Sequence, residues 1–236
     1  MIKTKFVIAL LLLPLLANAE DVKTPPGFKN KEEATSYALG IQTGRTLTKD
    51  GLPINFDQFI RGFKDQIDHK EIAIPESDLR QILTDFQNEL RREMKNKHAI
   101  LSVENGKKGE AFLKENKAKA GVVTLSSGLQ YSVIKSSNGD RPVDGDTVSV
   151  IYKGTLIDGK VFDATKDGVA IPMNIDQVIP GFREGLKLMT VGSQYKFFIP
   201  SGLAYGPRSV GSDIGPNETL VFEVELFGIT KGKPAQ

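Results

Sequence analysis

The chain has 236 residues with 31 basic and 29 acidic side chains, so its formal charge is only +2. Its length suits two domains, and a content of 39% hydrophobic and 25% charged residues is ordinary for a globular protein. Without Lys3 and Lys5, which lie in a segment that we expect to be removed, basic and acidic residues number 29 each. Because the charge is then balanced, we expect no nucleic-acid partner.

The first residues have the pattern of a secretory signal peptide. Two lysines precede an apolar run over 6–16, and Ala17-Asn18-Ala19 fits the small-x-small cleavage pattern. The apolar run is too short for a membrane span. We therefore predict a signal peptide over residues 1–19 and an exported protein. The sequence contains no cysteine, which excludes a disulfide framework.

Capping patterns mark the start of two short helices. Asn30 precedes Glu33 by three residues, and Asn55 precedes Gln58 by the same interval. Such pairs satisfy the free N–H groups of a first helical turn. Apolar residues then recur at helical spacing, and a Gly-Leu-Pro breaker over 51–53 separates the two segments.

A long helix is predicted next. Residues 76–119 contain no proline, and the first half carries an apolar stripe at intervals of three and four: Leu79, Ile82, Leu83, Phe86, Leu90 and Met94. A helix of about 44 residues would span about 66 Å at 1.5 Å per residue. The stripe can pack on the two short helices, but so small a core is marginal alone. We therefore predict that residues 20–74 form a helical dimerisation region and that the protein is a homodimer through its N-terminal helices.

The second half of this helix is poorer in apolar residues. Beyond Met94 the stripe thins, and lysine and glutamate predominate. We interpret residues 75–121 as a connecting helix whose second half is a solvated spacer. Gly106 and Gly109 each cost about 1 kcal/mol in a helix interior relative to alanine, so they mark the expected place of a bend.

The composition changes at Gly121, after which strand patterns predominate. Alternating or β-branched runs lie at 129–133, 147–152 and 219–227, and an Asp-Gly turn follows the second of them. One helix is expected near 181–189. The pattern predicts an α+β fold in which a bent antiparallel sheet wraps on one short helix over residues 122–236. A loop of about 20 residues before the last strand carries Leu203, Tyr205, Val210 and Ile214, which favours an ordered flap over a site.

Three motifs in this half resemble the FKBP-type peptidyl-prolyl isomerases. They lie at 148–163 (VSVIYKGTLIDGKVFD), 177–185 (QVIPGFREG) and 200–206 (PSGLAYG). Residues 20–120 resemble the dimerisation region and long connecting helix of the macrophage infectivity potentiator (Mip) subgroup, which includes virulence-associated members. The resemblance implies a location in the periplasm or at the cell surface, associated with the outer membrane. It also implies that proline-containing unfolded or flexible polypeptides are the partners, that macrolides of the rapamycin and tacrolimus type are candidate inhibitors, and that no cofactor or metal is needed.

The resemblance also assigns the site residues by motif match. The catalytic set comprises Tyr152, Phe162, Asp163, Phe182, Tyr205 and Phe222. The substrate-binding set comprises Val178, Ile179 and Ile214. Phe182 would form the floor of an apolar pocket, where the family more often has tryptophan. Val178 and Ile179 would present a backbone amide, and the Tyr205 hydroxyl would donate to a substrate carbonyl.

Physical chemistry gives these residues two interpretations. An Xaa-Pro amide rotates over a barrier of about 18 to 20 kcal/mol, and an apolar pocket that binds the twisted amide better than the planar one lowers this barrier without a nucleophile. By composition alone the same aromatic residues would be core hydrophobes, and the tyrosines ordinary buried tyrosines. A carboxylate beside aromatic rings needs a partner, so we expect Asp163 to accept a hydrogen bond from Tyr152.

Two functions remain open at this point. One is an exported isomerase that assists folding, and the other is a dimeric holding chaperone that uses the pocket and an inter-domain cleft to bind peptides. The two functions are compatible, because they share the cleft and the apolar stripe. An intact set of Phe162, Asp163 and Tyr205 favours catalysis.

Overall fold

The computed structural model describes residues 24–49 and 53–232, so the expected signal peptide over 1–19 lies outside the described residues. The chain divides into two compact units, Met1–Glu76 and Ser77–Gln236. Within the described residues, no helix combines the length and the apolar character that crossing a bilayer requires.

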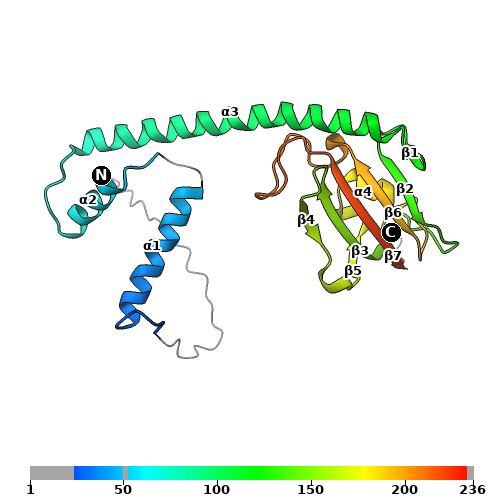
Figure 1. Ribbon diagram of the computed structural model, residues 1–236, viewed down its shortest axis with the longest axis horizontal. Coiled ribbons are helices and arrows are strands. Elements are labelled where there is room, and N and C mark those ends of the chain that lie inside the picture. Colours follow the sequence, from blue (N-terminus) through cyan, green and yellow to red (C-terminus); the bar gives the residue numbers. More distant parts are fainter. Residues whose placement is uncertain (1–23, 50–52, 233–236) are drawn as a thin grey trace, which may run out of the picture. The chain divides into compact units, whose positions relative to one another are not determined.

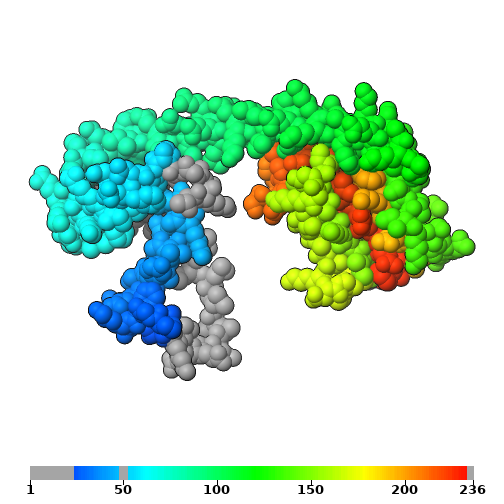
Figure 2. Space-filling model, viewed as in Figure 1, coloured from blue at the N-terminus to red at the C-terminus, as the bar shows by residue number. Residues whose placement is uncertain are grey.

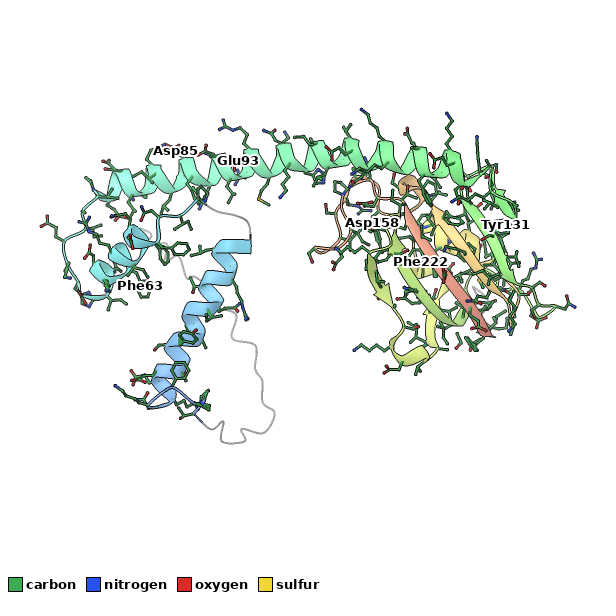
Figure 3. The ribbon with its side chains drawn as sticks, viewed as in Figure 1. Phe63, Asp85, Glu93, Tyr131, Asp158 and Phe222 are labelled. Atoms are coloured by element: carbon green, nitrogen blue, oxygen red, sulfur yellow. The ribbon has the colours of Figure 1, made fainter. Side chains whose placement is uncertain are left out.

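The N-terminal unit contains α1 (Lys31–Lys49) and α2 (Phe56–Ile67). The predicted caps are confirmed: Asn30 Oδ1 accepts from the Glu33 N–H at 2.9 Å, and Asn55 Oδ1 accepts from the Gln58 N–H at 3.1 Å. No residue of α2 is buried, and Phe63, labelled in Figure 3, is 58% exposed. The unit therefore presents an apolar surface that the described residues leave exposed.

Helix α3 (Glu76–Asn116) runs for 41 residues and continues through Gly106 and Gly109 without a break (Figure 1). The expectation that its second half is only a solvated spacer is wrong. Gly109 and Asn116 are buried, Asn116 to 1% exposure. The last four turns of α3 are therefore a packed part of the second unit.

Within residues 53–232, seven strands form one antiparallel sheet with the order β1-β2-β6-β7-β3-β4, and β5 pairs with the free edge of β3 (Figure 1). The strands are β1 (Val122–Thr124), β2 (Gln130–Lys135), β3 (Thr147–Leu156), β4 (Val161–Ala164), β5 (Ile171–Asn174), β6 (Gln194–Ile199) and β7 (Leu220–Thr230). Short 3₁₀ turns lie at Lys166–Gly168, Ile175–Gln177 and Ser201–Leu203. Register shifts interrupt the β3–β7, β3–β4 and β2–β6 ladders, and such bulges bend a sheet.

Helix α4 (Pro180–Leu186) packs on this sheet and confirms the expected α+β fold. Phe182 and Leu186 lie in the hydrophobic core with 3% and 0% of their surface exposed. Gly181 and Gly185, which have no side chain, allow α4 to approach β6 closely. A Cβ at Gly185 would lie 2.7 Å from the ring of Phe197, so a larger residue there would push α4 away from the sheet.

The end of α3 is joined to the sheet by polar and aromatic contacts. Asn116 Nδ2 donates to Gln130 Oε1 at 3.0 Å, and Gln130 Nε2 donates to the Leu113 carbonyl at 2.9 Å. The rings of Phe112 and Phe198 lie 5.9 Å apart. Figure 2 shows the green end of α3 lying directly on the domain. Because amide side chains make much of this contact, no apolar stripe in the sequence marks it.

Candidate active site

The candidate site is centred on a cluster of aromatic rings between β3, β4, β7 and α4. The centroids of Phe182 and Phe222 lie 4.8 Å apart, and Phe162 meets Phe222 edge to face at 5.5 Å. Tyr152 lies 6.2 Å from both Phe182 and Phe222. Phe182 is 3% exposed and also contacts Phe197 beneath it. Phe182 thus lies at the base of the cluster, while Phe162 and Tyr152 reach its partly exposed side.

A glycine in β3 makes room for these rings. Gly154 pairs with Asp163 of β4 on one side and with Phe222 of β7 on the other. A Cβ at this position would lie 2.7 Å from the ring of Phe162 and 3.0 Å from that of Phe222. The sequence interpretation did not include Gly154 among the site residues, although it lies inside the 148–163 motif.

The expected hydrogen bond between Tyr152 and Asp163 is confirmed. The phenol donates to Asp163 Oδ2 at 2.5 Å. Burial is the main cause that raises the pKa of Tyr152 above its ordinary value of 10.0, and the bond to the Asp163 carboxylate raises this pKa further. Tyr152 is therefore a neutral hydrogen-bond donor at physiological pH, and Asp163 is held against the edge of the aromatic cluster.

Val178 and Ile179 lie between a 3₁₀ turn and the first turn of α4. Both side chains pack against the core, and Pro180 opens the helix directly after them. The Ile179 carbonyl accepts from the N–H groups of Phe182 and Arg183, each at 3.0 Å. Within the described residues the Ile179 N–H donates to no oxygen, so it is available to a peptide carbonyl.

The loop between β6 and β7 supplies the remaining candidates and is ordered, as expected. Tyr205 packs against the core, and its hydroxyl makes no hydrogen bond to another described residue. Ile214 is 6% exposed and forms a β-bridge with Val210. At the outer side of the loop, Lys160 of the β3–β4 turn pairs with Asp213 at 2.8 Å and lowers the pKa of that carboxyl.

The nine candidate residues therefore occupy one region of the fold. Phe182, Ile214 and Phe222 belong to the buried core, and five more pack against it: Tyr152, Phe162, Val178, Ile179 and Tyr205. Asp163 is exposed and joins them through Tyr152. Phe222 is labelled in Figure 3 within the sheet. A separate hollow of about 390 Å³, near the end of α3, is lined by none of the nine.

The arrangement places an uncharged, apolar surface beside hydrogen-bond donors, which suits it to bind an apolar group. The base is aromatic, and the donors at its edge are the Ile179 amide and the Tyr205 phenol, which bond to no other group among residues 24–49 and 53–232. Among the described residues, no group of three or more histidine, cysteine or carboxylate side chains could hold a metal ion. A planar or twisted amide flanked by a proline ring matches this combination of apolar surface and donors.

Comparison with known proteins gives the family. Residues 139–227 match the family described as FKBP-type peptidyl-prolyl cis-trans isomerase, and residues 32–133 match the domain amino terminal to it. The chain belongs to the FKBP-type peptidyl-prolyl cis-trans isomerases and is an enzyme of that type.

The similarity to two relatives extends over nearly the whole chain. It is 39% identical to the "Outer membrane protein MIP" of Legionella longbeachae, over 97% of this chain and 99% of that protein. It is 36% identical to the "Peptidyl-prolyl cis-trans isomerase Mip" of Coxiella burnetii, over 92% and 94%. The crystal structure of FkpA from Escherichia coli matches with a TM-score of 0.67 and 37% identity, over 87% of this chain and 100% of that one. The predicted resemblance to the Mip subgroup is confirmed.

Proposed function

We propose that this isomerase is exported, acts as a homodimer and assists the folding of proline-containing polypeptides by binding the twisted Xaa-Pro amide against the aromatic cluster. The observation that carries the proposal is the cluster itself, in which Phe182 lies beneath Tyr152, Phe162 and Phe222 with hydrogen-bond donors at the edge.

The mechanism needs no covalent step. The planar amide has more separated charge than the twisted one, so an apolar site disfavours the planar form relative to the twisted form. The proline ring would lie on Phe182, the Ile179 N–H would bind a backbone carbonyl, and the Tyr205 hydroxyl would donate to a second one. A 10⁵-fold acceleration requires about 7 kcal/mol, which these contacts supply only if they are stronger in the twisted state.

The Tyr152–Asp163 pair holds one wall of the site. Because Asp163 accepts from a phenol that stays protonated, the pair fixes the ring of Tyr152 beside Phe182. Loss of the carboxylate frees that ring and removes a hydrogen bond from a half-buried phenol that water can still reach, at a cost of about 0.5 to 1.5 kcal/mol.

The test is catalysed cis/trans exchange of an Xaa-Pro tetrapeptide, measured by NMR with the full-length chain. We expect Asp163→Ala to lower kcat/KM severalfold. The matched control is Asp140→Ala, because Asp140 is also exposed and its carboxylate has no partner among the described residues. Equal activity of the two variants would refute the role of Asp163. Macrolides of the rapamycin type should inhibit the wild-type chain by competing for the same rings.

The proposed export and location are supported by the sequence of residues 1–19 and by the relatives. One relative is named as an outer membrane protein. We place this chain in the periplasm or at the outer membrane on that basis. Cell fractionation of the tagged full-length chain tests the location, and recovery in the cytoplasmic fraction at full length would contradict it.

Dimerisation is supported by the uncovered apolar side chains of the helices. Tyr37, Phe63 and Ile67 are each about 60% exposed in the single chain, at 60%, 58% and 59%. An exposed apolar surface of this kind marks an interaction site. Sedimentation equilibrium should give twice the mass of the processed chain, and Phe63→Asp should shift the mass toward the monomer.

The same surface supports the second candidate function, a holding chaperone. A chain that prevents aggregation through α1 and α2 should do so when the isomerase site is disabled. Suppression of aggregation of an unfolded client by the Tyr205→Phe variant separates this activity from catalysis. Loss of both activities in that one variant would assign client binding to the isomerase site instead.

A further inference from the structure

The loop that carries Tyr205 is fastened at its base by helix α3. The residues involved are Pro216 and Asn217 in the loop and Ser102 and Asn105 on the helix. Asn217 Nδ2 donates to Ser102 Oγ at 2.7 Å and to the Ser102 carbonyl at 3.3 Å. Asn105 Nδ2 donates to the carbonyl of the buried Pro216 at 3.0 Å. Figure 2 shows the orange loop lying against the green part of α3.

Asn217 also holds the other end of the loop. Its backbone N–H donates to the Gly206 carbonyl at 2.8 Å, and Gly206 directly follows Tyr205. Asn217 has a φ of 55°, in the left-handed region that asparagine tolerates better than most residues. This backbone conformation presents the side chain to α3 and the N–H to Gly206. Two hydrogen bonds in series therefore connect Ser102 on the helix with the residue beside the candidate phenol.

The outer attachment of the loop is weaker. Lys160 and Asp213 form an ion pair, but their side chains are 48% and 52% exposed. Exposed ion pairs contribute little to stability because water and salt screen them. Residues 207–213 are exposed throughout. The contacts at Asn217 and Pro216 are thus the better-defined restraint on the loop.

We infer that Asn217 is a positioning residue for the isomerase reaction: held by Ser102 on α3, it fixes Gly206 and thereby the Tyr205 hydroxyl in the place where a substrate carbonyl binds. The inference rests on the proposed role of Tyr205. On this inference, the second half of α3 helps to hold the catalytic site in place, in addition to connecting the two units.

The side chain of Asn217 can be removed without disturbing its backbone. Asn217→Gly permits the same positive φ and keeps the N–H that bonds Gly206, while it deletes the bonds to Ser102. Ser102→Ala deletes the hydroxyl from the other side, and Ser102→Thr restores a hydroxyl. Asn96→Ala is the matched control, because Asn96 lies exposed on the same helix and makes no hydrogen bond to a described side chain.

The test is a double-mutant cycle on kcat/KM for an Xaa-Pro tetrapeptide, with the full-length chain. We expect Ser102→Ala, which removes one hydrogen bond, to lower kcat/KM by about 2- to 10-fold. Asn217→Gly removes both bonds to Ser102 and should lower kcat/KM at least as much, and Asn96→Ala should leave it unchanged. Ser102→Thr should retain most of the activity. In the Tyr205→Phe background, Asn217→Gly should have no further effect, because it acts through the hydroxyl that is already missing.

Several outcomes would overturn the inference. Additive losses in the Tyr205→Phe background would show that Asn217 supports the fold in general and does not position the phenol. An Asn217→Gly variant with wild-type kcat/KM would show that the side chain positions nothing. Amide hydrogen exchange at Asn217 gives an independent measurement, because Asn217→Gly should accelerate it at position 217 and leave the strands unchanged. If the wild-type chain catalyses no exchange of the tetrapeptide, the proposed function fails, and unchanged protection at position 217 would then refute the fastening itself.

Discussion

Two glycines three residues apart on α3 should respond to alanine with opposite signs. A Cβ at Gly106 would meet nothing within 4 Å, whereas a Cβ at Gly109 would overlap the Thr219 hydroxyl and lie 3.3 Å from Thr219 Cβ. Thr219 is 3% exposed, so it has little room to move. The pair therefore tests whether the second half of α3 is seated on the domain.

The magnitudes follow from helix propensity and packing. Alanine gains about 0.5 to 1 kcal/mol over glycine in a helix, so Gly106→Ala should stabilise the chain by that amount. At Gly109 the same gain is outweighed by overpacking, which costs about 1 to 3 kcal/mol, and the net result should be a loss of about 0.5 to 2 kcal/mol. Thr219→Ala in the Gly109→Ala background should recover most of the loss.

Urea unfolding followed by tyrosine fluorescence measures these differences. Four of the five tyrosines lie after residue 121, so the signal reports mainly on the isomerase domain, and a Tyr37→Phe background removes the contribution of α1. The comparison uses the urea midpoint at equal slope, since a changed slope would indicate a departure from two-state behaviour. A stabilised Gly109→Ala variant would contradict the packing of α3 against Thr219.

Three further predictions concern the isomerase domain. Gly154→Ala should lower both stability, by about 1 to 3 kcal/mol, and kcat/KM, because the new Cβ displaces the ring of Phe162; circular dichroism and the exchange assay measure the two effects. The Asp146 carboxylate accepts hydrogen bonds from backbone N–H groups and a lysine, and these bonds lower its pKa below 3.8. Asp146→Asn should therefore lower the urea midpoint at pH 7. The difference between this variant and the wild type should disappear as the pH falls below 3.8, where the carboxylate of the folded protein becomes protonated. Burial raises the pKa of Glu218 above 4.5, so Glu218→Gln should raise the midpoint at pH 7 and lose this advantage below pH 4.5.

Capping, turn and periodicity patterns predicted much of the fold, because each depends on interactions between residues close together in the sequence. The caps at Asn30 and Asn55 form as expected, and the Asp158-Gly159 turn joins β3 and β4 with Gly159 at a φ of 89°. The periodicity of the last strand and of 181–189 also agrees with β7 and α4. These signals depend on residues close together in the sequence.

The docking of α3 could not be predicted in the same way. Some of its contacts join residues more than 100 positions apart, such as Ser102 and Asn217, and many of them use hydroxyl, amide and glycine groups that have no hydrophobic periodicity. Strand β5 (Ile171–Asn174) could not be predicted either, because it has only four residues and one of them is a proline.

The candidate site was predictable from the family motifs and from little else. Composition alone assigns Phe182 and Phe222 to the core, and the structure does bury them there. Only the neighbours of these two rings distinguish a site from a core. They are an exposed Asp163 bonded to Tyr152, and a Tyr205 hydroxyl that has no hydrogen-bond partner in the described part of the chain. The place of Gly154 beneath the rings follows from strand register, which the sequence does not show directly.

The central claim is that catalysis takes place at the aromatic cluster beneath the loop. Its most direct test is the rate of cis/trans exchange of an Xaa-Pro tetrapeptide with full-length Tyr205→Phe, compared with Tyr131→Phe. Both changes remove one hydroxyl, but Tyr131 lies on β2 and stacks on Tyr195, away from the cluster (Figure 3). The account predicts a severalfold lower kcat/KM for Tyr205→Phe and wild-type kcat/KM for Tyr131→Phe. Equal rates for the two variants would contradict it.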